Sequence, residues 1–432
     1  MENRYDKYKD SGIAWIGEIP EHWELRKGKN LFKLRNSKGN NNAILLAATQ
    51  KYGMIPQSQV EGVVQVKQNT DLNTFKTVHK NDYVISLRSF QGGFEMSEYE
   101  GVCSPAYQVF YSTKPCCNYF FKYMFKSYGF VSQINAFTLG IREGKNIQYE
   151  DFSLMKLPLP TIQEQQSIAT YLDQKCSEID ELITLQEEMI TKLQSYKQSV
   201  ITEAVTKGLD KNVPLKDSGI EWIGEIPEHW EVKRLKFSCN VFGRIGFRGY
   251  KSDDLVSEGN GAITLSPSNM KDMKMDYTNR TYLSWKKYYE SPEIMISKND
   301  ILMVKTGSTY GKCSFVDDIP MECTINPQIV VFKQHKDYPK FLAYSFQTKA
   351  TRAFVETSVV GGTIPTIAQE KIMNYFFAFP PLSEQQSIAT YLDQKCSEID
   401  ALISIKQQKI EKLKDYKKSL IFECVTGKRK VS

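Results

Sequence analysis

Three short patterns in this sequence resemble parts of catalytic or cofactor sites, and each lacks a residue that the chemistry needs. Glu143-x-Lys145 matches the end of a metal-dependent nuclease motif, but no Pro-Asp pair precedes it to help hold a cation. The string that begins Asn326-Pro327 lacks the aromatic residue with which enzymes that modify adenine hold a flipped base. Gly243, Gly246 and Gly249 do not have the dinucleotide spacing, and no G-x-x-x-x-G-K-[ST] loop occurs. The sequence therefore predicts no catalytic site.

The nine cysteines and four histidines form no recognisable metal or nucleophile pattern either. The cysteines include no C-x-x-C pair and no His/Cys cluster with zinc spacing, so we expect reduced thiols in a reducing compartment. His22 and His229 occupy the same place in two near-identical blocks, beside Trp23 and Trp230. We expect both histidines to be structural, and the tryptophans to anchor cores rather than to stack on bases.

The composition is that of a folded protein with room for more than one domain. The chain has 432 residues, of which 41% are apolar and 25% charged, and a formal net charge of +6. That small excess permits a polyanionic partner without requiring one. The first residues contain no apolar signal segment, and no stretch approaches the roughly 20 apolar residues that span a bilayer. We expect a protein that is neither exported nor inserted in a membrane.

Two segments occur twice, and they divide the chain into equivalent halves. DSGIAWIGEIPEHWE at 10–24 returns at 217–231 with one difference, Ala14 against Glu221, and EQQSIATYLDQKCSEID at 164–180 returns unchanged at 384–400. The first pair is offset by 207 positions and the second by 220, so the segments between them differ in length by 13 residues. The sequence thus predicts one structural unit that occurs twice, with central segments that differ in sequence and in length.

The two middles, 25–163 and 232–383, differ in sequence but share landmarks. Short β-branched and aromatic runs bounded by Asn, Asp, Gly and Pro predict strands joined by turns, in a mixed α/β or mostly β domain. The matching landmarks are Lys80-Asn81-Asp82 with Lys298-Asn299-Asp300, Pro105 with Pro327, Gly140 with Gly361, and Ile147 with Ile367. We therefore expect a common scaffold with divergent loops.

Each half closes with a long helix that carries a heptad pattern. Possible capping boxes, Thr161-x-x-Glu164 and Ser383-x-x-Gln386, mark the two starts. The predicted seam of the first helix is Leu172, Ile179, Gln186, Leu193 and Val200, with Ile168, Lys175, Leu182, Met189 and Tyr196; that of the second is Leu392, Ile399, Lys406, Leu413 and Leu420, with Ile388, Lys395, Leu402, Lys409 and Tyr416. Such a helix must bury its stripe, and we expect an antiparallel pairing of the two copies. A plain structural strut is the simpler alternative.

The order of these elements resembles the specificity subunit of type I restriction-modification enzymes. The resemblance covers essentially the whole chain. It is carried by Trp15 to Trp23 and its copy Trp222 to Trp230, and by Pro158-x-Pro160 through Glu164-Gln165-Gln166 with Pro380-Pro381 through Glu384-Gln385-Gln386. The second helix entry, FAFPPL, is shifted against LKLPLP, which leaves the position of its cap open.

The resemblance implies a non-catalytic reader of double-stranded DNA in a bacterial or archaeal cytoplasm. Two target recognition domains would each contact one half of a bipartite target. The helices would set the spacing and dock two methyltransferase subunits, and two restriction subunits would join the full enzyme. It also implies that this chain has no cofactor of its own, while S-adenosylmethionine, ATP and Mg²⁺ act in the partner subunits. The helix positions expected to dock these partners are Leu172, Ile179, Leu193, Leu392, Ile399 and Leu413.

Residues that touch DNA are expected in the loops that differ between the two middles. Base edges are read by Arg, Lys, Asn and Gln, while phosphates are also contacted by Ser, Thr and backbone amides. In the first middle the candidates are Thr49, Gln50, Lys51, Arg88, Gln91, Arg142, Lys145 and Asn146. In the second they are Ser266, Ser268, Asn269, Lys305, Ser308, Tyr310, Lys312, Thr363 and Thr366. For each of them a solvated loop residue is the plain alternative.

The predicted architecture is a pseudo-two-fold α/β (α+β) protein. Residues 1–160 form the first recognition domain, 161–207 the central spacer helix, 208–381 the second recognition domain and 382–432 the C-terminal spacer helix. The N-terminal block should lie beside the end of the second helix, as residues 217–231 follow the first. Three alternatives stay open: a nuclease or methyltransferase with an unrecognised site, a coiled-coil scaffold for proteins, and a silent member of the family.

Overall fold

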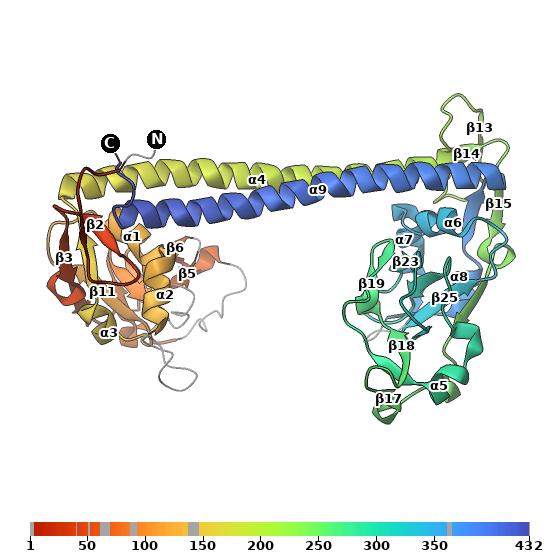
Figure 1. Ribbon diagram of the computed structural model, residues 1–432, viewed down its shortest axis with the longest axis horizontal. Coiled ribbons are helices and arrows are strands. Elements are labelled where there is room, and N and C mark those ends of the chain that lie inside the picture. Colours follow the sequence, from red (N-terminus) through yellow and green to blue (C-terminus); the bar gives the residue numbers. More distant parts are fainter. Residues whose placement is uncertain are drawn as a thin grey trace. The chain divides into compact units, whose positions relative to one another are not determined.

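The computed structural model describes residues 4–39, 41–50, 52–60, 70–86, 93–136, 147–360 and 365–431. The chain divides into two compact units (Figure 1). Unit 1 comprises Met1–Glu187 and Gln407–Ser432, and unit 2 comprises Glu188–Lys406. Each unit thus contains one strand-rich domain together with part of helix α4 (Ile162–Lys207) and part of helix α9 (Leu382–Val425). The fold is of the mixed α and β class that the sequence predicts.

Both units are built on the same four-stranded antiparallel sheet. In unit 1 the order is β4-β11-β8-β9, and in unit 2 it is β16-β25-β22-β23. The strands are β4 (Phe32–Arg35), β8 (Tyr83–Ile85), β9 (Phe94–Met96) and β11 (Gln108–Ser112), and then β16 (Asn240–Gly243), β22 (Ile301–Val304), β23 (Cys313–Phe315) and β25 (Ile329–Lys333). This identity of order confirms the common scaffold predicted from the landmarks.

The Lys-Asn-Asp landmarks form the same turn in both units. Asn81 and Asn299 have φ of 71° and 73°, a left-handed conformation that asparagine tolerates better than most residues. The carboxylate of Asp82 accepts from the His79 amide at 2.8 Å and pairs with Arg35 at 2.6 Å. Asp300 accepts from the Ser297 amide at 2.8 Å and pairs with Lys333 at 2.7 Å. The cation comes from a different strand in each unit, so only the turn itself is duplicated.

Smaller elements surround the two sheets. Those of unit 1 are β1 (Tyr8–Asp10), β2 (Glu18–Pro20), β3 (Glu24–Lys27), β5 (Leu46–Thr49), β6 (Gly53–Pro56), β7 (Lys76–Val78), β10 (Gly101–Cys103), β12 (Lys156–Leu159), α1 (Asn118–Lys126), α2 (Tyr128–Ala136) and α3 (Tyr149–Leu154). Those of unit 2 are β13 (Leu215–Asp217), β14 (Glu225–Pro227), β15 (Glu231–Arg234), β17 (Leu255–Val256), β18 (Gly261–Leu265), β19 (Met270–Lys271), β20 (Lys274–Met275), β21 (Tyr282–Ser284), β24 (Cys323–Ile325), β26 (Val359–Val360), β27 (Thr366–Ile367), β28 (Phe376–Phe379), α5 (Trp285–Tyr289), α6 (Pro339–Ser345), α7 (Lys349–Thr357) and α8 (Gln369–Met373). The landmark residues Ile147 and Ile367 are buried in their respective cores, whereas Gly140 and Gly361 lie outside the described residues.

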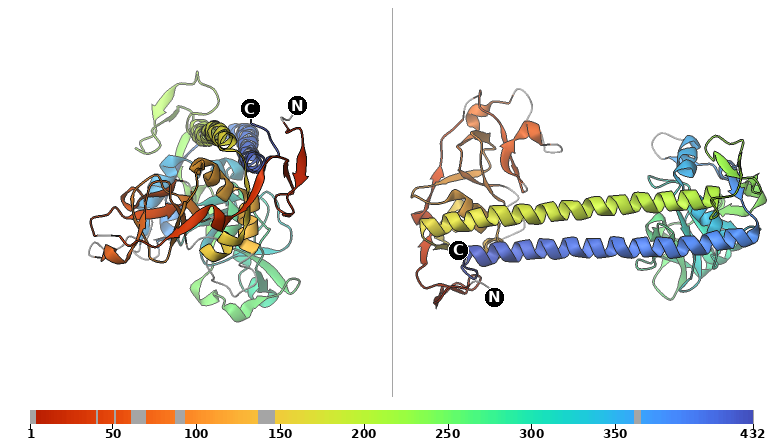
Figure 2. Two further views of the ribbon diagram at one scale, coloured as in Figure 1. Left: turned by 90° about the vertical axis from the view of Figure 1, so that its left-hand side faces the viewer. Right: turned by 90° about the horizontal axis from the view of Figure 1, so that it is seen from above.

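In each unit a segment of α4 packs against a segment of α9. In unit 1 the early α4 residues Leu172 and Ile179 share a core with Leu420 and Cys424 of late α9. In unit 2 the late α4 residues Val200 and Ala204 share a core with Ile388 and Leu392 of early α9. The pairing is therefore antiparallel within each unit, and the views from the side and from above show the two helices running next to each other (Figures 1 and 2).

One of the two predicted seam series on each helix is wrong by one position. The series through Leu172, Ile179 and Gln186 is buried, but Leu182 and Tyr196 of the second series are 43% and 57% exposed. The positions that face the partner helix are instead Cys176, Ile183, Ile190, Lys197 and Ala204 on α4, and Cys396, Ile403, Ile410, Lys417 and Cys424 on α9. Both registers alternate steps of four and three residues, and sequence reasoning favoured the one with the larger side chains. Ile168 and Ile388 of that register are nevertheless buried, as predicted.

Among the described residues, none of the helices has the length and apolar character needed to cross a membrane, and no cluster of His, Cys, Asp or Glu could hold a metal ion.

Candidate nucleic-acid interface

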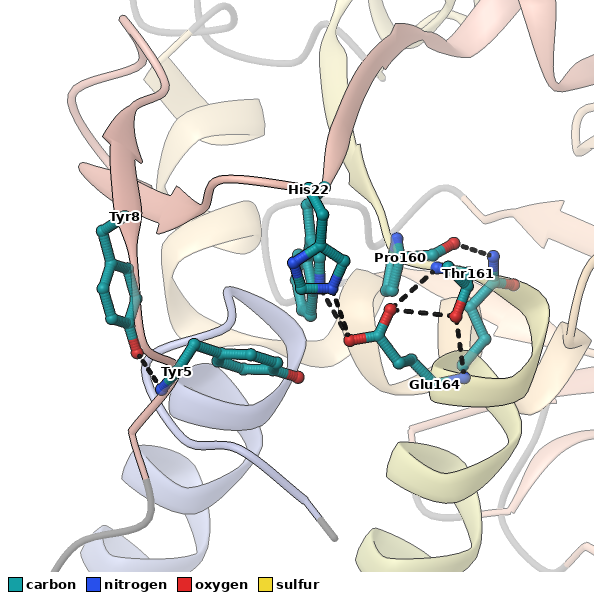
Figure 3. Close-up of polar contacts among 8 residues, drawn as sticks. Tyr5, Tyr8, His22, Pro160, Thr161 and Glu164 are labelled. Carbon is teal, nitrogen blue, oxygen red and sulfur yellow. Dashed lines mark hydrogen bonds and ion pairs between the residues drawn. The ribbon is translucent and has the colours of Figure 1, made fainter.

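The duplicated segments attach each recognition domain to a helix. Glu164 accepts hydrogen bonds from the Trp23 indole at 3.2 Å and from His22 at 2.9 Å (Figure 3). Its second carboxylate oxygen accepts from the amide and hydroxyl of Thr161 at 3.1 and 2.9 Å. We call this arrangement the Trp-Glu latch. It confirms the first predicted capping box and the structural role of the histidine and tryptophan.

Unit 2 repeats the latch with one difference. Glu384 accepts from Trp230 at 3.1 Å and from His229 at 2.8 Å. Pro381 stands where unit 1 has Thr161, and it offers neither an amide nor a hydroxyl. Helix α9 already begins at Leu382, so Ser383 lies within its first turn and the predicted Ser383-x-x-Gln386 cap is wrong.

The glutamine that follows each latch glutamate fixes the start of a domain helix. Gln165 is buried, accepts from the amide of Cys117 at 3.0 Å and donates to the Pro160 carbonyl at 2.9 Å. Gln385 likewise accepts from the amide of Tyr338 at 2.8 Å and donates to the Pro380 carbonyl at 2.9 Å. Cys117 and Tyr338 are the residues that precede α1 and α6. The unchanged repeat sequence thus encodes one docking geometry, used twice.

The N-terminal block lies against the end of α9, as predicted. The two described chain ends are side by side in unit 1 (Figure 2). Lys428 donates to the carbonyl of Glu18. A Cβ on Gly427 would lie 2.3 Å from Cδ of Pro20 and 3.2 Å from the ring of Trp23. In unit 2 a Cβ on Gly208 would lie 3.3 Å from the ring of Trp230. Both glycines have a positive φ, 74° and 76°, which favours glycine after the end of a helix. Each position also leaves little room for a side chain.

Several predicted DNA-contacting residues meet at one end of the sheet in unit 2. Gly243 at the end of β16 pairs with Val330 of β25, and Val304 at the end of β22 pairs with Ile329. The segment after β22 carries Lys305, Ser308, Tyr310 and Lys312, and Thr306 forms a bridge to Thr366. Ser266 is close by, because the Asn326 amide donates to the carbonyl of Leu265 at 2.9 Å. The segments that follow β16, β18 and β22 therefore lie close to the segment that precedes β25. We call this end of the unit 2 domain the rim.

Two of the predicted residues have their hydrogen-bonding groups committed to their own turns. Asn269 is buried, its carbonyl oxygen accepts from the Ser266 amide at 3.0 Å, and its amide donates to the carbonyls of Asp276 and Asn279. Thr49 donates to the Gly53 carbonyl at 2.9 Å and accepts from the Tyr52 amide at 3.1 Å. Their polar groups shape the loops. The Ser266 hydroxyl also belongs to the turn of Asn269, because it contacts the Ser268 hydroxyl at 2.7 Å and donates to Oδ1 of Asn269 at 3.0 Å.

A cavity of about 330 Å³ opens beside the turn between β22 and β23. Its polar lining includes Asp272, Ser308, Lys312, Arg352 and Glu356. Two cationic and two anionic side chains balance, so the cavity does not favour a ligand of either charge.

Many unit 1 candidates cannot be placed. Lys51, Arg88, Gln91, Arg142, Lys145 and Asn146 lie outside the described residues, as does Thr363 in unit 2. Gln50 follows β5 in the turn to β6. At the corresponding sheet end of unit 1 the structure brings together Gln108 and Gln148, whose side chains are hydrogen-bonded. Sequence reasoning missed this pair because the two residues are 40 positions apart, and no local pattern joins them.

The helix positions predicted to dock partners lie on the seam between α4 and α9. Leu172, Ile179, Leu392 and Ile399 are buried, and Leu193 and Leu413 are half-buried. They hold the two helices together, which leaves them little surface for another protein. Large apolar side chains are exposed instead on a neighbouring face: Leu182, Leu185, Met189 and Tyr196 on α4, and Tyr391, Leu402, Ile405 and Tyr416 on α9. We call this set the exposed apolar stripe.

Comparison with known proteins identifies the architecture. Residues 20–194 and 227–415 match the model of the type I restriction modification DNA specificity domain, once in each half of the chain. The chain belongs to this family. Among its relatives are two archaeal specificity subunits from Methanocaldococcus jannaschii. The MjaVIII subunit is 26% identical over 67% of this chain and 66% of its own length, which is just under two thirds of that relative. The putative MjaX subunit is 25% identical over 96% of both.

Solved structures agree on the fold. A chain from a study of complex assembly in a type I R-M system superposes with a TM-score of 0.72 at 16% identity, covering 94% of this chain and 98% of that one. The HsdS subunit from Thermoanaerobacter tengcongensis gives a TM-score of 0.54 at 16% identity, covering 95% and 98%. As a member of the specificity family, this chain is a DNA-recognition subunit and not itself an enzyme.

Proposed function

We propose that this specificity subunit gives a type I restriction-modification complex its specificity for a bipartite DNA sequence. One observation carries the proposal: equivalent latches and docking glutamines and the same sheet order support two domains whose rim loops differ in sequence. A duplicated scaffold with different loops is suited to reading two different half-sites at a spacing that the helices set. S-adenosylmethionine, ATP and Mg²⁺ are then expected in partner subunits, and the site of action is the cytoplasm.

The exposed apolar stripe is the surface that we assign to the methyltransferase subunits. On each helix it lies beside the seam. In unit 2 Tyr196 of α4 lies near Lys395 of α9, and in unit 1 Tyr416 of α9 lies near Lys175 of α4, so the stripes of the two helices share one side of the pair. The opposite side carries Asp173 and Asp393, which accept from domain tyrosines at 2.6 and 2.8 Å. The domains therefore leave the apolar side open, and such a surface favours apolar helices of a partner.

Recognition of a bipartite target is tested by mapping methylated adenines in the host genome with the gene intact and with the gene deleted in frame. We expect one split motif, two short half-sites around a fixed gap, to vanish with the gene. An unchanged map would instead favour the scaffold or the silent-member alternative.

The docking surface has a matched test. Leu402→Arg places a charge in the exposed apolar stripe, while Ser404→Arg places the same charge on a nearby exposed residue that faces away from the stripe. We expect Leu402→Arg to reduce co-purification of the methyltransferase subunits at least tenfold, and Ser404→Arg to leave it unchanged. Equal losses for the two variants would argue against this surface. A normal yield of folded protein for both variants is the control for stability.

A further inference from the structure

Lys305 stands at the centre of the unit 2 rim and is held there on both sides. It is the first residue after β22. Its amide donates to the Gln328 carbonyl at 2.7 Å, and its carbonyl accepts from the amide of Ile367 at 2.8 Å. These bonds tie it to the loop before β25 and to the segment before α8. The backbone under this side chain is thus fixed by two neighbouring segments, unlike that of a lysine in a free loop.

Gly243 leaves open the space above Lys305. Its φ lies outside the left-handed region, so conformation does not require glycine at this position. A Cβ there would lie 3.3 Å from Oε1 of Gln369, 3.4 Å from Nζ of Lys305 and 3.2 Å from Val330. Any side chain would crowd the polar ends of Lys305 and Gln369. A glycine inside a strand with no conformational need is typical of a place where another molecule approaches closely.

The ammonium of Lys305 is half-buried without a compensating charge. Among the residues that the structure describes, no carboxylate pairs with it. Burial alone lowers its pKa, with no contribution from an acidic neighbour. Lys333, at the opposite end of β25, differs because it pairs with Asp300 at 2.7 Å. Keeping a partly dehydrated cation unpaired costs stability, and residues that do so tend to serve a ligand.

We propose that Lys305 reads a base edge in the half-site bound by the second recognition domain, with Gln369 beside it and Gly243 giving access to the groove. The proposal rests on the proposed function and deepens it. The acceptors that suit a lysine in the major groove are O6 and N7 of guanine. A cation held at a fixed position suits a base edge, whereas contacts to phosphate position the protein without reading sequence. Lys312, on the turn between β22 and β23, is also half-buried and is the comparison residue for a phosphate contact.

The test is competition binding by the purified complex with its methyltransferase subunits. The competitors are duplexes in which each base pair of the target is changed in turn. For the wild type, changing the base pair read by Lys305 should weaken binding about 10- to 100-fold. In Lys305→Met that cost should fall below about threefold, while the costs at all other positions, including the whole other half-site, stay as they were. Lys312→Met should weaken binding to all duplexes alike and lower the salt dependence.

The outcomes separate the inference from the function on which it rests. If the wild-type complex prefers no split target, the proposed function fails. If the wild type is selective but Lys305→Met keeps every positional cost, or loses affinity evenly as Lys312→Met does, the assignment of Lys305 as a base reader is overturned. Melting of the free subunit provides a second readout. Removing an unpaired half-buried charge should leave the melting temperature of Lys305→Met equal to or above that of the wild type, and a marked decrease would make Lys305 structural.

Discussion

The two Trp-Glu latches allow a comparison inside one molecule, because Glu164→Ala and Glu384→Ala remove equivalent side chains. Each variant leaves the indole N–H of a fully buried tryptophan, Trp23 or Trp230, without its acceptor. An unsatisfied buried donor costs about 1–3 kcal/mol. Glu164→Ala also breaks the capping box with Thr161, worth about 1 kcal/mol more. We therefore expect losses of about 2–4 kcal/mol for Glu164→Ala and about 1–3 kcal/mol for Glu384→Ala.

Hydrogen exchange of peptides around each latch measures these losses locally. A difference of about 1 kcal/mol corresponds to roughly fivefold in exchange rate. Exchange near residues 18–27 should therefore accelerate more in Glu164→Ala than exchange near residues 225–234 in Glu384→Ala. Equal accelerations, or a larger one at the second latch, would refute the assignment of the extra stability to Thr161.

The same latch should weaken in acid. Burial tends to raise the pKa of Glu164, but hydrogen bonds from His22, Thr161 and Trp23 outweigh it, and the net pKa lies below the ordinary value of 4.5. The stabilisation is therefore complete above the unfolded pKa and is lost as the pH falls through the folded one. The difference in stability between wild type and Glu164→Ala should shrink below about pH 4. A difference that stays constant down to pH 3 would contradict a role for the charged carboxylate.

Two further predictions concern other parts of unit 1. Burial, partly opposed by Lys126, raises the pKa of Glu95 to about 7, so the folded state holds a proton that the unfolded state releases between pH 4.5 and 7. The free energy of unfolding, measured by urea denaturation, should therefore fall by up to roughly 3 kcal/mol from pH 5 to pH 8, and Glu95→Gln should remove this dependence. Gly427→Ala should lower the melting temperature more than Gly12→Ala, because both have a positive φ but only Gly427 would place its Cβ against Pro20. Similar shifts for the two glycine variants would show that backbone conformation alone decides the cost.

The attachment of the domains to the helices was readable from sequence because it depends on unchanged side chains. The repeated segments predict the tryptophan anchors, the structural histidines, the cap of α4 and the contact of the N-terminal block with α9, but not the hydrogen bonds that join Trp23 and His22 to Glu164. The second cap failed because Pro381, not Ser383, is the counterpart of Thr161 at the repeat offset of 220, and proline has no N–H or hydroxyl to complete a capping box. The choice of seam failed because a heptad pattern with apolar residues at three positions fits two registers, and only the packing of α4 on α9 distinguishes them.

The rim of the recognition domain could be predicted only in outline. Sequence alone determined the class of protein, the duplication and the strand-bounded loops in which recognition residues lie, because these depend on local patterns and repeated motifs. Tertiary structure decided which of those residues have free polar groups. Asn269 and Thr49 are committed to their own turns, whereas Lys305 lies beside Gly243 and Gln369, which come from segments more than 60 residues away along the chain. The Gln369 amide also donates to the Val241 carbonyl. This proximity follows from the order β16-β25-β22-β23, in which strands distant along the chain become neighbours, and no pattern within a single segment encodes it.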